Sequence, residues 1–204
     1  MSWKKVFNKI VQELALGGIH IYKYYIAFTA ILVLFISGCS SPNQISNSDL
    51  EKYDVEKKID ESMQGDFVFR LVSDEKEYEA GDDVKLYGEI TYVGDKDEVN
   101  IHHSSSAILF PMEEKVRGFD IGYVVKEIGM STMLKQGEPY REEYRKSGNY
   151  VEDAPIDYEK FMKKFSEMEG FPPGYYVVNG ETDFSLEGQE RILMKATIDF
   201  KVGE

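Results

Sequence analysis

Hydrophobic and polar residues alternate along most of the chain from Asp66 onward. Phe67, Phe69 and Leu71 share one side of the first alternating segment, and residues 84–92 repeat the pattern after a turn, with Tyr87 and Glu89 on the polar side. Successive side chains of a strand point to opposite faces, so a period of two predicts strands with one buried and one solvent-facing side. The other segments of strand length are 99–103, 107–112, 119–128 and 192–202.

About seven such strands, separated by short turns, predict a mainly β domain over residues 66–204, built as an antiparallel β-sandwich. Residues 155–169 depart from the alternation. Their apolar side chains recur every three or four residues, which predicts a helix. Pro155 suits the first helical turn and Gly170 suits the stop. We therefore expect one short helical insertion, packed on an edge of the sandwich with its aromatic face inward.

Residues 39–65 are polar and carry few large apolar side chains. A segment of this composition buries too little apolar surface to offset the entropy that it loses on ordering. We expect a flexible tether with at most a short helix around residues 50–63. As a coil it would span on the order of 25 Å.

The residues before this tether combine a basic start with an apolar run. Lysines at positions 4, 5, 9 and 23 precede a hydrophobic run over 26–38, and Cys39, the only cysteine of the chain, follows directly. Small residues before the cysteine and polar residues after it resemble a bacterial lipoprotein signal. The resemblance implies that residues 1–38 are removed as a signal peptide. It also implies that Cys39 carries a diacylglycerol anchor, whose two acyl chains suffice for stable membrane attachment.

This resemblance places the domain on the extracytoplasmic face of the cell membrane, with the membrane as a partner through Cys39. An uncleaved signal anchor is the alternative, although the apolar run is shorter than the roughly 20 residues of a comfortable span. A membrane-surface helix near the N-terminus is a further alternative, because residues 3–14 have an apolar and a basic face.

Charge excludes one class of partner. The chain has 24 basic and 37 acidic residues; loss of residues 1–38 removes four and one of these, leaving 20 and 36 and a net charge of −16. A domain of this charge repels the phosphate backbone, so we expect no nucleic-acid binding.

Three phrases of the globular part resemble a known family when taken together. They are residues 78–84 (YEAGDDV), 134–138 (LKQGE) and 172–177 (PPGYYV). In this order they resemble bacterial immunoglobulin-like β-sandwiches of the Bacillus intracellular proteinase inhibitor type, over about residues 67–202. The resemblance implies an immunoglobulin-like sandwich and, as one candidate activity, inhibition of proteases.

The turns in these phrases have simple physical roles. Gly81 is expected to take a positive φ before the next strand, and Pro173-Gly174 is expected to do the same before Tyr175. A tyrosine soon after such a turn often packs across the sandwich edge and bonds a backbone group through its hydroxyl.

Few residues carry recognisable chemistry. The sequence contains no nucleophile elbow, phosphate-binding loop or cofactor fingerprint. His102 and His103 are adjacent on a predicted strand and so face opposite sides, which prevents them from chelating one metal together. We expect no catalytic residue, no cofactor and no metal. A site made by His102 with carboxylates of a neighbouring strand, and weak calcium contact at the Asp95 turn, are the alternatives.

Tyrosines cluster in one region. Six of the fourteen lie within residues 140–176, together with arginines and lysines in an otherwise acidic domain. Tyrosine and arginine are enriched at protein interfaces. The cluster predicts a protein-partner surface that includes Tyr140, Tyr144, Arg145 and Tyr150; aromatic packing in the core is the alternative interpretation.

These observations predict a non-catalytic cell-surface lipoprotein whose tethered domain binds a partner or assists another protein of the bacterial envelope. A membrane-tethered protease inhibitor is the alternative. An envelope enzyme and a spacer without a specific partner remain open.

Overall fold

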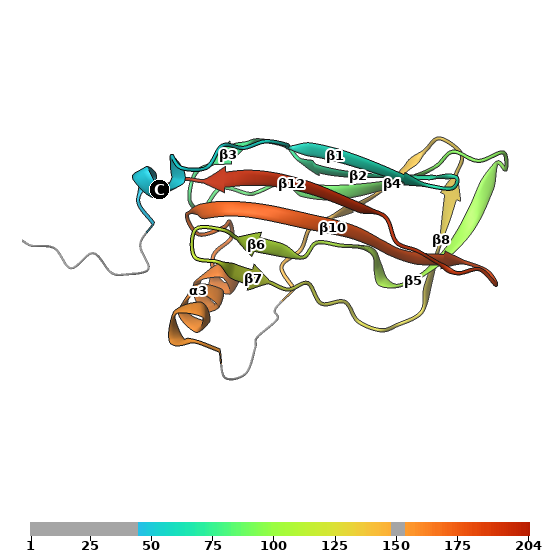
Figure 1. Cartoon of the computed structure of the whole chain (residues 1–204). Helices are drawn as coiled ribbons and strands as arrows, with labels where there is room; N and C mark the ends of the chain where they lie inside the picture. The colour runs from blue at the N-terminus through green and yellow to red at the C-terminus, as the bar shows by residue number, and fades with distance from the viewer. Residues whose placement is uncertain (1–44, 148–153) are drawn as a thin grey trace, which may run out of the picture. The chain divides into compact units, whose positions relative to one another are not determined.

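The computed structural model describes residues 45–147 and 154–204, and Ile45–Glu204 forms one compact unit. Two β-sheets packed together make up most of it, with one short helix, α3, on their outside (Figure 1). The elements in chain order are α2 (Asn47–Leu50), β1 (Ile59–Gln64), β2 (Phe67–Ser73), β3 (Glu77–Tyr78), β4 (Leu86–Tyr92), β5 (Glu98–Leu109), β6 (Met112–Glu114), β7 (Phe119–Ile121), β8 (Met130–Lys135), β9 (Pro139–Glu143), α3 (Ile156–Glu167), β10 (Gly174–Leu186), β11 (Arg191–Ile192) and β12 (Lys195–Val202).

The first sheet has the strand order β1-β2-β4-β9 and the second the order β3-β12-β10-β5-β8, with β6, β7 and β11 paired alongside. All neighbours are antiparallel except β3 and β12. The predicted mainly β fold with two layers is confirmed.

The core lies between the sheets and follows the predicted alternation. Phe69 and Leu71 of β2 and Ile90 of β4 are fully buried from one side, and Ile198 and Phe200 of β12 from the other. Aromatic rings from both sheets and the helix join this core, as expected for large rings that contribute most of the buried apolar area.

The helical insertion is confirmed. Helix α3 buries Phe161, Met162 and Phe165, and its aromatic side faces the sandwich, where Phe119 of β7 contacts Tyr158 and Phe161. Figure 1 shows α3 lying beside β6 and β7. The strand-like pattern of residues 119–128, in contrast, is a strand only over Phe119–Ile121, and the segment 107–112 is divided between β5 and β6.

The folded part begins earlier than the sequence predicts. Ile45 and Leu50 are buried against Tyr175, and β1 pairs with β2 along its whole length, so the segment expected to be a tether over 39–65 is folded from Ile45 onward. The few apolar residues of this segment pack together around the ring of Tyr175. The backbone of this segment is held by Asp199, whose carboxylate accepts the N–H groups of Glu56 and Lys57.

Of the two glycines predicted to have a positive φ, only Gly81 does. Gly81 has a φ of +94°, as expected, but Gly174 is not among the glycines of positive φ. Gly174 is required for a different reason, because a Cβ there would lie 2.9 Å from Oε1 of the buried Glu114. The predicted tyrosine contact is confirmed by Tyr176, whose hydroxyl donates to the carbonyl oxygen of Pro172 at 2.7 Å.

Within residues 45–147 and 154–204, no helix is long and apolar enough to cross a membrane.

Candidate functional site

The predicted lipidation site and the four residues predicted to bind a partner fall into three groups. Cys39 and Tyr150 lie outside the described residues. Tyr140 and Tyr144 are half-buried and point into the aromatic core, where Tyr144 contacts Phe110 and other rings; Arg145 is exposed. Tyr140 and Tyr144 thus face largely into the domain, while Arg145, the residue after Tyr144, is exposed.

Tyr140 takes part in a small polar network between the sheets. Its hydroxyl donates to Oε1 of Glu142 at 2.8 Å, and the same carboxylate accepts the backbone N–H of Ala107 at 2.9 Å and the hydroxyl of Ser106. Burial, together with this carboxylate, raises the pKa of Tyr140 to about 12. Burial also raises the pKa of Tyr144 above its usual range.

Tyr144 also lines a groove at one end of the first sheet. The groove has a volume of about 320 Å³ and is formed by the start of β4, the residues after β2 and the end of β9. Its lining residues are Asp74, Asp83, Val84, Lys85, Leu86, Tyr87, Arg141, Glu143 and Tyr144. We call this the edge groove.

Arg141 is the most firmly held exposed side chain of the edge groove. Its Nε and Nη2 atoms donate to Oε1 of Glu89 at 2.9 and 2.7 Å, and its guanidinium lies 3.8 Å from the centre of the Tyr87 ring. The side chain of Glu89 is 9 % exposed and that of Arg141 is 50 % exposed. The hydrogen bonds to Glu89 raise the pKa of Arg141 and fix its orientation. A half-exposed cation is thus presented in one geometry.

This ion pair belongs to a row of alternating charges across the first sheet. The strand register sets Glu61 opposite Arg70, Arg70 opposite Glu89, and Glu89 opposite Arg141. Opposite charges at facing positions of neighbouring strands stabilise the pairing. The row therefore supports both the sheet and the position of Arg141.

The sequence placed Tyr87 and Glu89 on the polar side of their strand, which is correct. It could not show that β9 pairs with β4, because strand pairing between segments 50 residues apart leaves no local signal. The Tyr87–Arg141 contact was missed for this reason.

Lys146, a basic residue of the predicted cluster, has a structural role. Its Nζ donates to the carbonyl oxygens of Phe165, Met168 and Gly170 at the end of α3, and it lies over the Phe165 ring at 4.5 Å. Burial lowers the pKa of Lys146. A lysine that satisfies the last carbonyls of a helix anchors its C-terminus.

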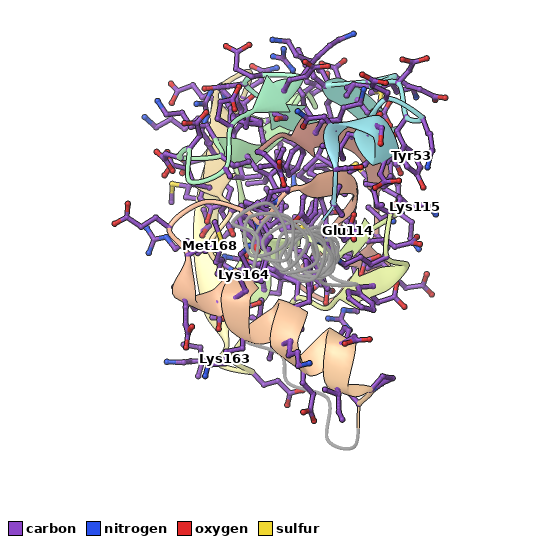
Figure 2. The ribbon with its side chains drawn as sticks, turned by 90° about the vertical axis from the view of Figure 1, so that its left-hand side faces the viewer. Tyr53, Glu114, Lys115, Lys163, Lys164 and Met168 are labelled. Atoms are coloured by element: carbon purple, nitrogen blue, oxygen red, sulfur yellow. The ribbon has the colours of Figure 1, made fainter. Side chains whose placement is uncertain are left out.

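Two buried carboxylates also accept hydrogen bonds from backbone N–H groups. Glu114 accepts N–H groups of Val116, Arg117 and Tyr175, and Asp199 accepts those of Glu56 and Lys57. Figure 2 looks at this end of the domain, with Glu114 among the interior side chains and Lys163 of α3 pointing away from the sheets.

A second groove of about 310 Å³ lies between α2, β3 and the end of β12, with carboxylates of Glu51, Glu77, Glu79 and Asp82 on its walls. His102 lines neither this groove nor the edge groove. His102 bonds the hydroxyl of Ser131, and His103 bonds that of Thr132. Among the described residues, no group of three or more His, Cys, Asp or Glu is placed to hold a metal ion.

No protein-family model matches the chain, and comparison with curated proteins gives no match either.

Proposed function

We propose that this chain is a cell-surface lipoprotein of the bacterial envelope, anchored through Cys39, whose folded domain is a non-catalytic binding or accessory module. The support for the anchor is the sequence from Ile26 to Cys39: an apolar run, small residues and then the only cysteine. Two acyl chains on Cys39 would keep the domain on the extracytoplasmic face of the cell membrane.

The proposed anchor would hold the domain close to the bilayer. Ile45 is buried in the domain and stands only six residues after Cys39 in the sequence. Six fully extended residues reach about 20 Å at most. The domain would therefore act near the membrane surface rather than at the end of a long tether.

For the fold, we propose an immunoglobulin-like sandwich. Supporting features are the two layers of mainly antiparallel strands and the Tyr176 hydroxyl that returns to the Pro172 carbonyl four residues upstream. Because one fold serves many functions, this similarity carries no activity with it.

The observation that carries the binding role is the Tyr87–Arg141 pair of the edge groove. Binding loses affinity when side chains must be ordered, and Arg141 is already ordered by Glu89 below it and Tyr87 beside it. Tyrosine and arginine are the residues that most often dominate interface energies. The edge groove therefore presents a prepared contact for a protein partner.

A non-catalytic role is supported by how the buried carboxylates are used. Glu114, Asp199 and Glu89 each accept hydrogen bonds from backbone N–H groups or an arginine. These contacts hold the chain in place, which is a structural use.

The test is site-specific crosslinking in cells that produce the full chain. A photoreactive residue replaces Lys85 in the edge groove or, as a control, Lys195 on β12. We expect one discrete crosslinked product at position 85 only, lost with Arg141→Ala. Arg191→Ala, which breaks the exposed ion pair with Asp183 on β10, should leave it unchanged.

Background labelling at both positions, or a product that survives Arg141→Ala, would refute the edge groove as the binding surface. The inhibitor alternative has its own signature. The crosslinked partner would be a protease, and the purified chain would slow that protease.

A further inference from the structure

We propose that β8 is an intermolecular edge through which two copies of this chain join their larger sheets by antiparallel pairing of β8 with β8. The inference is independent of the proposed anchor and of the edge groove. It starts from the backbone of β8, which ends the sheet order β3-β12-β10-β5-β8.

The register shows which backbone groups of β8 are free to pair. The N–H of Gln136 donates to the carbonyl of Asp97, and along the same register Leu134 faces Val99. Hydrogen-bonded pairs alternate in an antiparallel ladder, so every second residue of β8 bonds β5. The N–H and C=O groups of Ser131 and Met133 and the N–H of Lys135 point the other way, and in the part of the chain that the structure describes no strand pairs with them. The carbonyl oxygen of Lys135 accepts the N–H of Glu138.

The side chains of β8 do not protect this edge. Exposed edges are usually blunted by charge, proline or short length. From Met130 to Leu134 the strand has no charged residue, and Met130 and Met133 are 45 % and 59 % exposed. Lys135, its last residue, carries the only charge.

The other strands that end the two main strand orders, β1, β9 and β3, carry such protection. Strand β3 has only two residues. Self-pairing of β1 about its centre would set Glu61 against Glu61 of the second copy. Self-pairing of β9 would place Arg141 opposite Arg141 of the second copy, or Glu142 opposite Glu142. Pro139 of β9 also has no backbone N–H to donate to a partner strand.

Charge selects a second copy as the occupant of β8. The two-fold register that uses all three outward residues has Met133 opposite Met133 and Lys135 opposite Ser131 of the second copy. No like charges then face each other, although the domain as a whole is acidic. Pairing would satisfy the free backbone groups and cover the exposed methionines.

The test is disulfide crosslinking of the full chain in cells. Residues opposite each other in a hydrogen-bonded pair have Cα atoms about 5.5 Å apart, which suits a disulfide. Under mild oxidation, Met133→Cys should give a linked dimer. Met63→Cys is the matched control, because Met63 is an equally exposed methionine on the edge strand β1. The wild-type chain measures any link through Cys39.

Two further substitutions in the Met133→Cys chain test the register. Ser131→Lys places a lysine opposite Lys135 of the second copy at both ends of the interface, and this repulsion should lower the dimer yield about tenfold. Ser131→Glu places a glutamate opposite Lys135 instead and should preserve the yield. Both lose the Ser131 contact with His102 equally. Equal yields from positions 133 and 63, or equal loss with both Ser131 substitutions, would overturn the proposal.

Discussion

The side chain of Glu114 is fully buried, and four N–H groups donate hydrogen bonds to its carboxylate. The backbone N–H groups of Val116, Arg117 and Tyr175 donate to it, and Nη1 of Arg117 lies 3.1 Å from its Oε2. A buried carboxylate is tolerated when its oxygens are fully hydrogen-bonded and a cation is adjacent. This one residue joins the turn after β6 to the start of β10.

Glu114→Gln should therefore destabilise the domain by about 3 kcal/mol, because a neutral amide with one acceptor oxygen replaces the buried carboxylate that these four N–H groups share. Its neighbour Glu113 makes only an exposed pair with Lys115, so Glu113→Gln should cost less than about 0.5 kcal/mol. Urea unfolding of both variants measures the difference. Equal stability of the two variants would show that the Glu114 network contributes little.

Several tyrosines make the domain sensitive to alkali. Burial, with Glu142 adding, raises the pKa of Tyr140 to about 12 from its usual 10. Between these values the folded state holds the proton more tightly than the unfolded state, so stability is complete below pH 10 and falls as the pH rises toward 12. Urea unfolding at pH 8, 10 and 11 should show this fall, with a shallower slope for Tyr140→Phe. Constant stability up to pH 11 would contradict the assignment.

At the scale of elements, the predictions succeeded where a strand has one wet and one buried face. Strands β2, β4 and β12 show that pattern in sequence and in structure. The central strand β10 was not among the predicted strands; it contains Asn179-Gly180, a dipeptide more typical of turns. Gly180 has another role: it faces Leu71 of the opposite sheet, and a Cβ there would lie 2.8 Å from a Leu71 methyl carbon. Contacts between sheets leave no pattern in the local sequence.

Gly180→Ala should accordingly separate the sheets locally and cost about 1–3 kcal/mol. Gly129→Ala is the control, since a Cβ at Gly129 meets no atom within 4 Å. A smaller side chain at position 71 should relieve the clash, so adding Leu71→Val should restore part of the stability lost in Gly180→Ala. The same addition should restore no stability in Gly129→Ala. A double-mutant cycle of unfolding free energies measures both effects. Additive effects of the Gly180 and Leu71 substitutions would refute this contact as the reason for the glycine.

At the scale of the molecule, residues 45–57 are part of the domain rather than a tether. Asp199 on β12 accepts two backbone N–H groups of this segment, and the Tyr175 hydroxyl donates to the same carboxylate at 2.7 Å. The polar composition of the segment does not indicate that it is folded, because hydrogen bonds to a strand distant in the sequence hold it in place. Of the candidate site, the sequence supplied the residue types and the polar face of β4, while the pairing of β9 with β4 created the groove.

Metabolic labelling tests whether a lipid on Cys39 holds the domain at the membrane surface. Cells producing the wild-type chain or Cys39→Ser are grown with a labelled fatty acid and separated into membrane and soluble fractions. We expect a labelled wild-type protein that begins at Cys39, lies in the membrane fraction and is accessible to protease added outside. Cys39→Ser should carry no label. An unlabelled wild-type protein that keeps residues 1–38 would contradict the claim.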